Sequence, residues 1–444
     1  MTSYWRSVSA LLFLFGSTCS CLGQTATEQL AKLYGAGQLD AVIAQGQQGL
    51  ATHPDQPLVS MLIGRAYADK QQFREAVPYL TRSLTNTRTP TDEKAWSKAY
   101  LGTCYYGLQQ YPEARKALEE VVAQAATRNV TSYAAKRLPL ARAAELATKW
   151  EALETSHFRF RFQNPKRIGS LPAYAAVHEQ AYETNNRFFE ATVPRKIDFF
   201  VWDDALEASR ILGTELGFTQ PYMVTIHVLP DQTKGHEITH MLTHYGLQPT
   251  RTTKLINEGV AVCFDQTNRN RLQMARQQAS GQTDIWRMWE QPDLFPSKQV
   301  YAVGGALLEY LLAHASKAEV KQLLREQTPQ MGRQLFGKQL ADFERELTTP
   351  DPAIAKSIAR AAPATLVPVK LTTAQVNAVV EQRNAAAKYY KVLVLLNGVP
   401  VPSAHLEQQN PQQIKDIKVL KTKEEIRAYT DVELNGIILV TTGG

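Results

Sequence analysis

The sequence predicts a multidomain fold in which an α-helical repeat domain precedes an α+β domain and a small αβ domain. Three observations support this prediction: a repeating helical pattern comes first, mixed strand and helix patterns follow, and a strand-turn-strand pattern closes the chain. A chain of 444 residues is long enough for about three domains, and 44% hydrophobic with 20% charged residues is ordinary globular composition. The expected parts are a signal peptide at 1–23, helical repeats at 24–146, the α+β domain at 150–350, a linker and helix at 351–388, and the αβ domain at 389–444.

The first 23 residues have the layout of a secretory signal peptide. Arg6 precedes the apolar run Ala10–Phe15 and small residues follow, so cleavage is expected before Gln24. The run is too short to cross a bilayer and no later stretch is long enough, so no transmembrane span is expected in the mature chain. The protein is therefore expected to be exported, either periplasmic or associated with the cell envelope. Cys19 and Cys21 leave lipid attachment open.

A helical pattern repeats between residues 25 and 146. A weak copy runs through Leu33, Leu39 and Val42. The two clear copies match at five positions each: Gly64, Tyr67, Phe73, Ala76 and Leu80 in the first, and Gly102, Tyr105, Tyr111, Ala114 and Leu118 in the second. This pattern resembles tetratricopeptide (TPR) repeats, in which helix pairs stack on their neighbours. The resemblance implies either a groove that docks a protein partner or a scaffold that packs on the next domain.

A zinc-site pattern lies in the middle of the chain, where residues 235–240 read Gly-His-Glu-Ile-Thr-His. On a helix, His236 and His240 lie on one face and can place two imidazole nitrogens on one Zn²⁺. Glu237 projects beside the metal, where a carboxylate can take a proton from an activated water as general base. Catalytic zinc needs a third protein ligand, and Glu258, eighteen residues after His240, opens a second apolar helix that can pack beside the first. The expected site has His236, His240 and Glu258 as ligands and Glu237 as the catalytic base.

Other interpretations of these histidines fit less well. Two histidines one turn apart can be ordinary helix residues, but three of the nine histidines fall between 236 and 244. His244 cannot complete the site, because a rise of about 1.5 Å per residue places it about 12 Å from His236 along the axis. The glycine and histidine of the metzincin pattern are replaced here by Thr243 and Gly246. Glu258 therefore remains the expected third ligand.

Several segments accompany the zinc motif in a fixed order: Trp150–Phe162, Lys196–Val201, Leu216–Pro221, Asn257–Gly259, Tyr301–Gly304 and Glu309–Leu312. Together with the motif they resemble the gluzincins, in particular the peptidase MA-like domains. The resemblance implies that 150–350 is an α+β gluzincin metallopeptidase domain, with the same zinc ligands and base. The Gly-x-Met-Glu-Asn element of the aminopeptidase branch is absent, and Gly259 stands where thermolysin-like enzymes have alanine. Endopeptidase versus exopeptidase action therefore stays open.

Three further features are candidates for parts of the site. Metallopeptidases stabilise the oxyanion with a second electrophile, and Tyr301 is the candidate, with a tyrosine packed at a helix start as the alternative. Asp265 lies two turns beyond Glu258 and can orient a zinc histidine, although an ordinary helix-end aspartate is the simpler interpretation. The strand pattern of 222–229 predicts either the cleft's edge strand, which can hold an extended peptide, or an internal strand.

The last part of the chain, 389–444, predicts a strand, an Asn-Gly turn, a helix and two more strands. The segments that carry this pattern are Lys391–Val401, Asn410–Lys421 and Asn435–Thr442. They resemble the plug domain of TonB-dependent receptors. No β-barrel pattern follows, so the resemblance implies a small module of cell-envelope proteins, used for docking or as a structural appendage, and not transport.

Composition excludes several other functions. The formal net charge of +7 is spread without a long Lys/Arg run, so no nucleic-acid partner is expected. The chain has no Gly-x-Ser-x-Gly elbow, no Gly-Lys-Ser/Thr loop and no Cys-x-x-Cys pair. The sequence thus predicts an exported zinc metallopeptidase that acts on a peptide or protein substrate, with a further protein partner on the repeats. The alternative is a non-catalytic cell-envelope scaffold that binds partners through the repeats and retains the peptidase fold.

Overall fold

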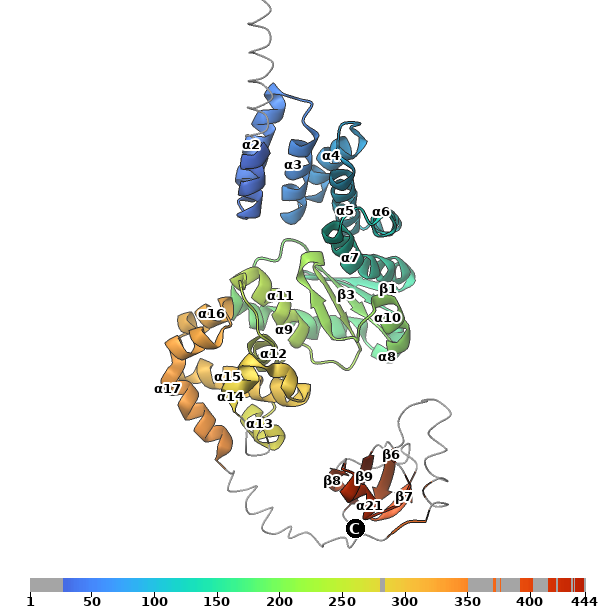
Figure 1. Cartoon of the computed structure of the whole chain (residues 1–444), viewed down its shortest axis with the longest axis vertical. Helices are drawn as coiled ribbons and strands as arrows, with labels where there is room; N and C mark the ends of the chain where they lie inside the picture. The colour runs from blue at the N-terminus through green and yellow to red at the C-terminus, as the bar shows by residue number, and fades with distance from the viewer. Residues whose placement is uncertain are drawn as a thin grey trace, which may run out of the picture. The chain divides into compact units, whose positions relative to one another are not determined.

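The computed structural model describes residues 27–279, 284–349, 370–372, 376, 392–401, 414–420, 422–432, 434 and 436–442. The chain divides into two compact units, Met1–Pro350 and Asp351–Gly444. The first holds helical repeats and a mixed sheet with further helices, and the second holds a smaller mixed sheet (Figure 1). A layout of helical and mixed α/β parts is thus confirmed. The predicted signal peptide, Cys19, Cys21 and nearly all of 351–388 lie outside the described residues.

Paired helices form the N-terminal part of the first unit (Figure 1). A helix at 27–35 precedes α2 (Leu39–Thr52), α3 (Pro57–Asp69), α4 (Phe73–Thr85), α5 (Thr91–Gly107), α6 (Tyr111–Gln124) and α7 (Arg128–Leu146). Each helix packs on the next one along the chain. The turns before α4 and α6 have the same geometry, because Gln71 and Gln109 both adopt left-handed φ angles, of 59° and 62°.

The glycines of the repeat are needed where the two helices of a pair cross. A Cβ added to Gly64 would lie 2.6 Å from Leu80 Cγ, and one added to Gly102 would lie 2.8 Å from Leu118 Cγ. Real side chains do not approach this closely, so a larger residue would force each pair apart. The sequence repeat therefore corresponds to a repeat in three dimensions.

A five-stranded mixed sheet follows the repeats. Its strands are β1 (Glu151–Glu154), β2 (Phe158–Phe162), β3 (Ile197–Val201), β4 (Phe218–Gln220) and β5 (Thr225–Val228). The order is β1-β2-β3-β5-β4, with parallel pairing among β2, β3 and β5 and antiparallel pairing at both edges. Every residue of β3 and β5 is buried, as expected for central strands covered on both faces.

The edge strand beside the zinc motif is β4, and β5 is internal. The sequence predicts a strand at 222–229, either at the edge of the sheet or inside it. In the structure this strand is β5, which lies between β3 and β4 and is therefore internal. The 3-10 turn η2 (Pro221–Met223) and Val224, with a φ of 47°, reverse the chain between the two strands. The residues before the turn form β4, which pairs with β5 and lies at the edge of the sheet.

The repeats and the sheet share a hydrophobic core, and the sheet contains a largely buried ion network. Phe200 and Trp202, at the end of β3, pack with buried side chains of α5, α6 and α7. Asp198 on β3 is 3% exposed and pairs with Arg195 at 2.7 Å and with Arg159 at 3.1 Å. Buried charges are tolerated when they are paired in this way.

Helices cover the sheet and extend beyond it to Thr349. The remaining helices of this unit are η1 (Ala147–Lys149), α8 (Pro165–Ile168), α9 (Leu171–Phe189), α10 (Ala205–Leu212), α11 (His236–Leu247), α12 (Lys254–Cys263), α13 (Arg271–Ala279), α14 (Ile285–Glu290), η3 (Pro292–Leu294), α15 (Ser297–His314), α16 (Lys317–Arg325) and α17 (Pro329–Thr348). One large hydrophobic core joins β2, β3 and β5 to α9, α11, α12 and the helices after it. Among the described residues, no helix is long and apolar enough to cross a membrane.

The second unit contains a four-stranded mixed sheet. Its elements are β6 (Val392–Leu396), β7 (Val399–Val401), β8 (Ile414–Leu420), α21 (Lys423–Arg427) and β9 (Gly436–Thr442), with strand order β7-β6-β9-β8. The predicted Asn-Gly turn is confirmed, because Asn397 and Gly398 join β6 to β7 with φ angles of 49° and 85°.

The sequence predicts a helix and two strands after the turn; β8 and β9 are two such strands, and residues 402–413, before β8, lie outside the described residues. Residues 414–420 form β8, and the helix α21 comes after it. Strand β8 runs antiparallel to β9, with Leu420 opposite Ile437.

Candidate metal centre

His236 and His240 lie one turn apart at the start of α11, so both imidazoles face the same side of the helix. Their ring centroids are 5.1 Å apart. Gly235 precedes the helix and lies against the chain that leaves α12, because a Cβ there would be 2.3 Å from the Phe264 carbonyl oxygen. This close approach brings the two helices of the motif together.

Glu258 lies on α12 and points at both histidines. Its Oε2 is 3.4 Å from His236 Nε2 and 3.5 Å from His240 Nε2, and one ligand atom from each residue lies within 4.8 Å of the other two. The structure therefore brings the three predicted ligands together as a possible metal-binding triad. Their side chains are only 14–18% exposed.

The spacing of the triad fits a tetrahedral metal. Direct N–H···O hydrogen bonds are usually about 2.7–3.2 Å long, shorter than either separation here. Ligand atoms about 2.0–2.1 Å from a tetrahedral zinc are about 3.4 Å apart, from the geometry of the tetrahedron. The two measured distances match this edge length. Two imidazoles and one carboxylate are also a donor set that binds zinc well.

The electrostatics of the triad favour its ionised carboxylate. Burial by itself would raise the pKa of Glu258, but the two histidines beside it outweigh burial and hold the pKa well below its usual range. Burial likewise opposes a charge on His240, but Glu258 and Glu237 raise the pKa of that imidazole. Negative charge from Glu258 and Glu237 thus gathers where a cation would sit.

Glu237 lies beside the triad and is held by a residue that the sequence did not single out. Its side chain is buried, and its Oε1 is 4.0 Å from His236 Nε2. Thr219, in the middle of β4, lies with its hydroxyl 2.9 Å from Glu237 Oε2 and 2.8 Å from the Glu237 carbonyl oxygen. Thr219 therefore fixes one carboxylate oxygen and leaves the other facing the triad. The segment around Thr219 was recognised in the sequence, but no pattern there assigns its hydroxyl a partner.

Tyr301, the candidate electrophile, is one turn into α15 and lies against the triad. Its ring is parallel to that of His236 within 2°, at a centroid distance of 6.0 Å. Burial raises the pKa of Tyr301 above its ordinary value, and the nearby charge of Glu258 adds to the shift. The phenol therefore keeps its proton and can donate it in a hydrogen bond.

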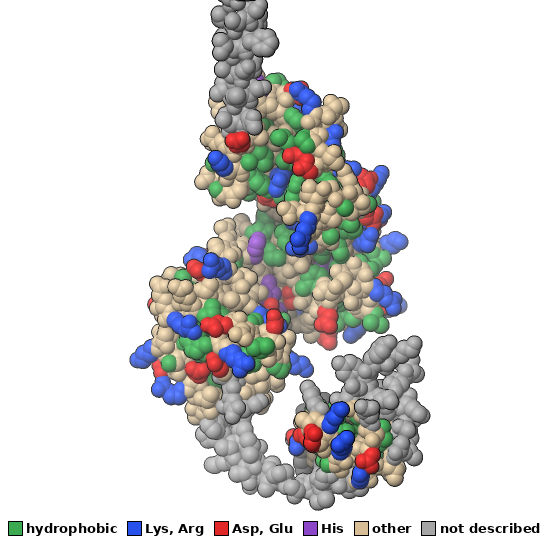
Figure 2. Space-filling view, viewed as in Figure 1, with side chains coloured by type: hydrophobic (Ala, Val, Ile, Leu, Met, Phe, Trp, Pro, Cys, Tyr) green, Lys and Arg blue, Asp and Glu red, His purple; other side chains and the backbone are tan. Residues whose placement is uncertain are grey.

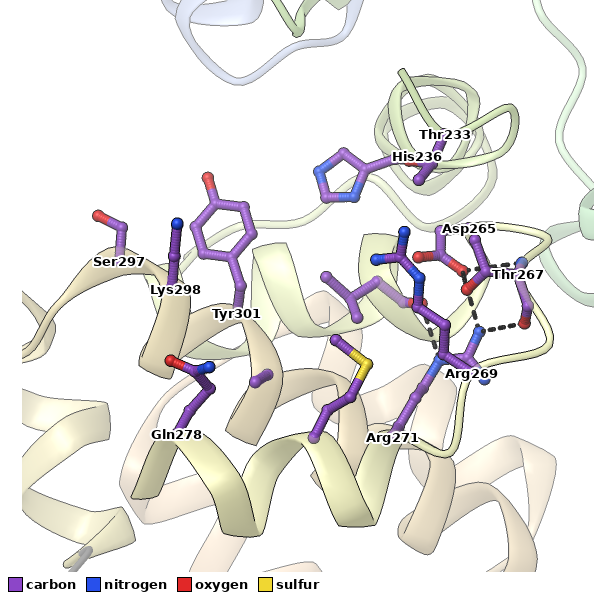
Figure 3. Close-up of a pocket in the computed structure, with 13 residues that line it drawn as sticks. Thr233, His236, Asp265, Thr267, Arg269, Arg271, Gln278, Ser297, Lys298 and Tyr301 are labelled. Atoms are coloured by element: carbon purple, nitrogen blue, oxygen red, sulfur yellow. Dashed lines mark hydrogen bonds and ion pairs between the residues drawn. The ribbon is translucent and has the colours of Figure 1, made fainter. Parts of the chain in front are cut away.

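Asp265 lines the same cavity as His236 (Figure 3). Its Oδ1 accepts hydrogen bonds from Thr267 at 2.6 Å and from Arg271 at 3.0 Å, and a role in orienting a zinc histidine stays a prediction. A different residue lies beside His240: the Asn257 amide is 3.4 Å from its Nδ1. The same amide nitrogen is 3.5 Å from Glu258 Oε1, so Asn257 lies beside two of the three triad residues.

Two cavities flank the triad. The first, of about 420 Å³, lies on the His236 side and is formed by the end of α12, the loop after it, α13 and the start of α15 (Figure 3). The second, of about 320 Å³, lies on the Glu237 side and is lined by β4, α11 and the loop before α12. Tyr301 lines both. Figure 2 shows histidine side chains reaching the surface in a hollow of the first unit.

No protein-family model matches this chain, and no curated protein matches it. The gluzincin, TPR and plug-domain resemblances therefore stay predictions from the sequence.

Proposed function

We propose that this protein is an exported zinc-dependent metallopeptidase. The observation that supports this proposal most strongly is the spacing of His236, His240 and Glu258, which matches the edge of a zinc tetrahedron. Three protein ligands leave a fourth position open, as catalytic zinc requires, whereas structural zinc has four protein ligands. The cavities on both sides of the triad give a substrate access to that position.

The chemistry divides between the metal and the side chains. Bound zinc supplies a Lewis acid that polarises a peptide carbonyl and lowers the pKa of water. Glu237 takes a proton from the attacking water and passes it to the leaving amine, with Thr219 fixing the carboxylate. Tyr301 donates a hydrogen bond to the carbonyl oxygen as negative charge develops on it. Each group lies beside the triad in the structure.

The edge strand supports a peptide as substrate. Strand β4 closes the sheet on the side of the second cavity, and among the described residues no strand pairs with its outer edge. An extended peptide can add to such an edge through main-chain hydrogen bonds, which gives affinity with little dependence on side chains. Thr219 lies on this strand, so peptide binding and the position of the Glu237 base are linked.

The other parts of the chain complete the proposal. The helical repeats hold a protein partner or brace the peptidase domain through their shared core with the sheet. Residues 389–444 act as a plug-like module of the cell envelope, and residues 1–23 direct export.

Zinc content and peptide cleavage test this function together. The full chain should bind one zinc per molecule and cut peptides in a mixed library, as read by mass spectrometry, while Glu237→Gln should bind zinc without cutting. His240→Gln should lose zinc, and His244→Gln, on the same helix but outside the triad, is the matched control that should keep it. Zinc binding without any cleavage by the wild type would overturn the peptidase and leave the non-catalytic scaffold. Failure to bind zinc would overturn both the cofactor and the mechanism.

A further inference from the structure

The first cavity carries positive charge that no residue of the described chain neutralises. Its lining includes four charged side chains, Asp265, Arg269, Arg271 and Lys298. Asp265 and Arg271 pair with each other at 3.0 Å and are both buried. Arg271 also bonds Glu309 at 2.9 Å, so its charge is compensated within the fold.

Arg269 and Lys298 are the remaining two cations. Within the described residues, no carboxylate lies within 4.0 Å of either, and neither makes a hydrogen bond. They come from opposite walls: Arg269 follows α12, and Lys298 is in the first turn of α15, one turn before Tyr301 (Figure 3). Gln278 on α13 lies below Lys298 in this view and also lines the cavity (Figure 3). Both cations line one cavity, so an anionic group bound there gains a favourable electrostatic interaction with each of them.

The position of this cavity makes the charge a substrate determinant. His236 and Tyr301 line it, so a peptide bond at the triad has one of its flanking groups in the first cavity and the other side along β4. The cavity volume of about 420 Å³ is large enough for a side chain or a terminal residue. Val262 and Met274 supply apolar wall, which suits the methylene groups of such a residue.

We propose that the first cavity selects substrates that place a carboxylate between Arg269 and Lys298. This inference rests on the proposed peptidase function and adds its substrate class. The carboxylate belongs either to a glutamate or aspartate side chain or to the free C-terminus of the peptide. The first source means cleavage within chains at acidic residues, and the second means removal of C-terminal residues.

Matched peptides separate the two sources. One pair has blocked ends and differs only in glutamate against glutamine at a single position, scanned across the peptide. The other pair has no acidic residue and differs only in a free against an amidated C-terminus. Binding to zinc-loaded Glu237→Gln full chain by fluorescence anisotropy, and kcat/KM of the wild type, are measured for both pairs. The carboxylate member of one pair should be favoured about tenfold, equivalent to about 1.4 kcal/mol.

The variants Arg269→Gln and Lys298→Gln, singly and combined, test whether these cations cause the preference. The ratio between the carboxylate peptide and its uncharged partner should fall in each single variant and should be about one in the double variant. Arg269→Glu should favour a lysine-containing peptide instead. Lys338→Gln, which removes an exposed cation on α17, is the control that should leave the preference unchanged. Arg269 and Lys298 are both exposed, so these substitutions should not disturb folding, which thermal unfolding will check.

The possible outcomes separate failure of the carboxylate pocket from failure of the proposed peptidase function. Cleavage with equal rates for both members of each pair overturns the carboxylate pocket and leaves the peptidase. Tenfold tighter binding of a carboxylate peptide without cleavage by the wild type overturns the peptidase and supports the pocket. A preference that survives the double variant assigns the selectivity to other residues and overturns the inference.

Discussion

Replacement of Thr219 by valine tests whether the edge strand positions the catalytic base. Valine keeps the shape and the β-branching of threonine but removes the hydroxyl that lies 2.9 Å from Glu237 Oε2. A hydrogen bond to a charged group contributes about 1.5–3 kcal/mol, which corresponds to about 10- to 150-fold in rate if all of it serves the transition state. The Thr219 hydroxyl has one proton and also faces the Glu237 carbonyl oxygen, so we expect an effect at the lower end of this range. We expect kcat to fall about 10- to 30-fold in Thr219→Val.

The assay separates positioning from folding and from substrate binding. KM and zinc content should change by less than about twofold, because the main chain of β4 and the triad stay in place. Thr219→Ser, which restores a hydroxyl at the same position, should recover most of the rate. If Thr219→Val keeps kcat within about twofold of the wild type, the hydrogen bond does not position the base. If KM rises while kcat stays constant, Thr219 acts on peptide binding alone.

Three further predictions concern stability and metal binding. Burial lowers the pKa of His178 to about 4, so between about pH 6.5 and pH 4 the unfolded chain binds a proton that the folded chain does not, and the free energy of unfolding falls as the pH falls. Urea unfolding at pH 7 and at pH 4.5 should show a loss of about 2–3 kcal/mol in the free energy of unfolding, and His178→Gln should lack this loss. Asp198→Ala leaves two largely buried arginines without their counter-charge and should cost about 3 kcal/mol in urea unfolding, against less than about 1 kcal/mol for Asp342→Ala in a more exposed pair. Gly259→Ala places a Cβ 2.6 Å from the α15 backbone and should weaken zinc binding at least tenfold by calorimetry, whereas Gly337→Ala, in open space, should not.

The core of the site could be predicted from sequence because its signal is local. His236, Glu237 and His240 fall on one helix, where spacing alone fixes which side chains share a face. Glu258 required only that two apolar helices pack together, and the structure places its carboxylate at the histidines. The Asn397-Gly398 turn is local in the same sense. In each case, a few neighbouring residues determine the geometry.

The parts that were missed depend on contacts between distant segments. Thr219 reaches Glu237 because a reversal of the chain at η2 moves β4 to the sheet edge, and no residue pattern encodes that reversal. Asp265 pairs with Arg271, on the next helix, and no pattern in the sequence indicates this pairing.

The geometry of the triad is held by backbone contacts more than by its side chains. The start of α11 lies against the Phe264 carbonyl at Gly235, and α12 lies against α15 at Gly259, whose added Cβ would meet the Gly304 backbone. Backbone packed this tightly cannot shift without breaking the core, so the distances among the ligand atoms are set before any metal binds. Such preorganisation lowers the cost of binding and of reaction, because little rearrangement is left for either step. Substitutions at these glycines should therefore alter zinc affinity even though none of them contributes a ligand.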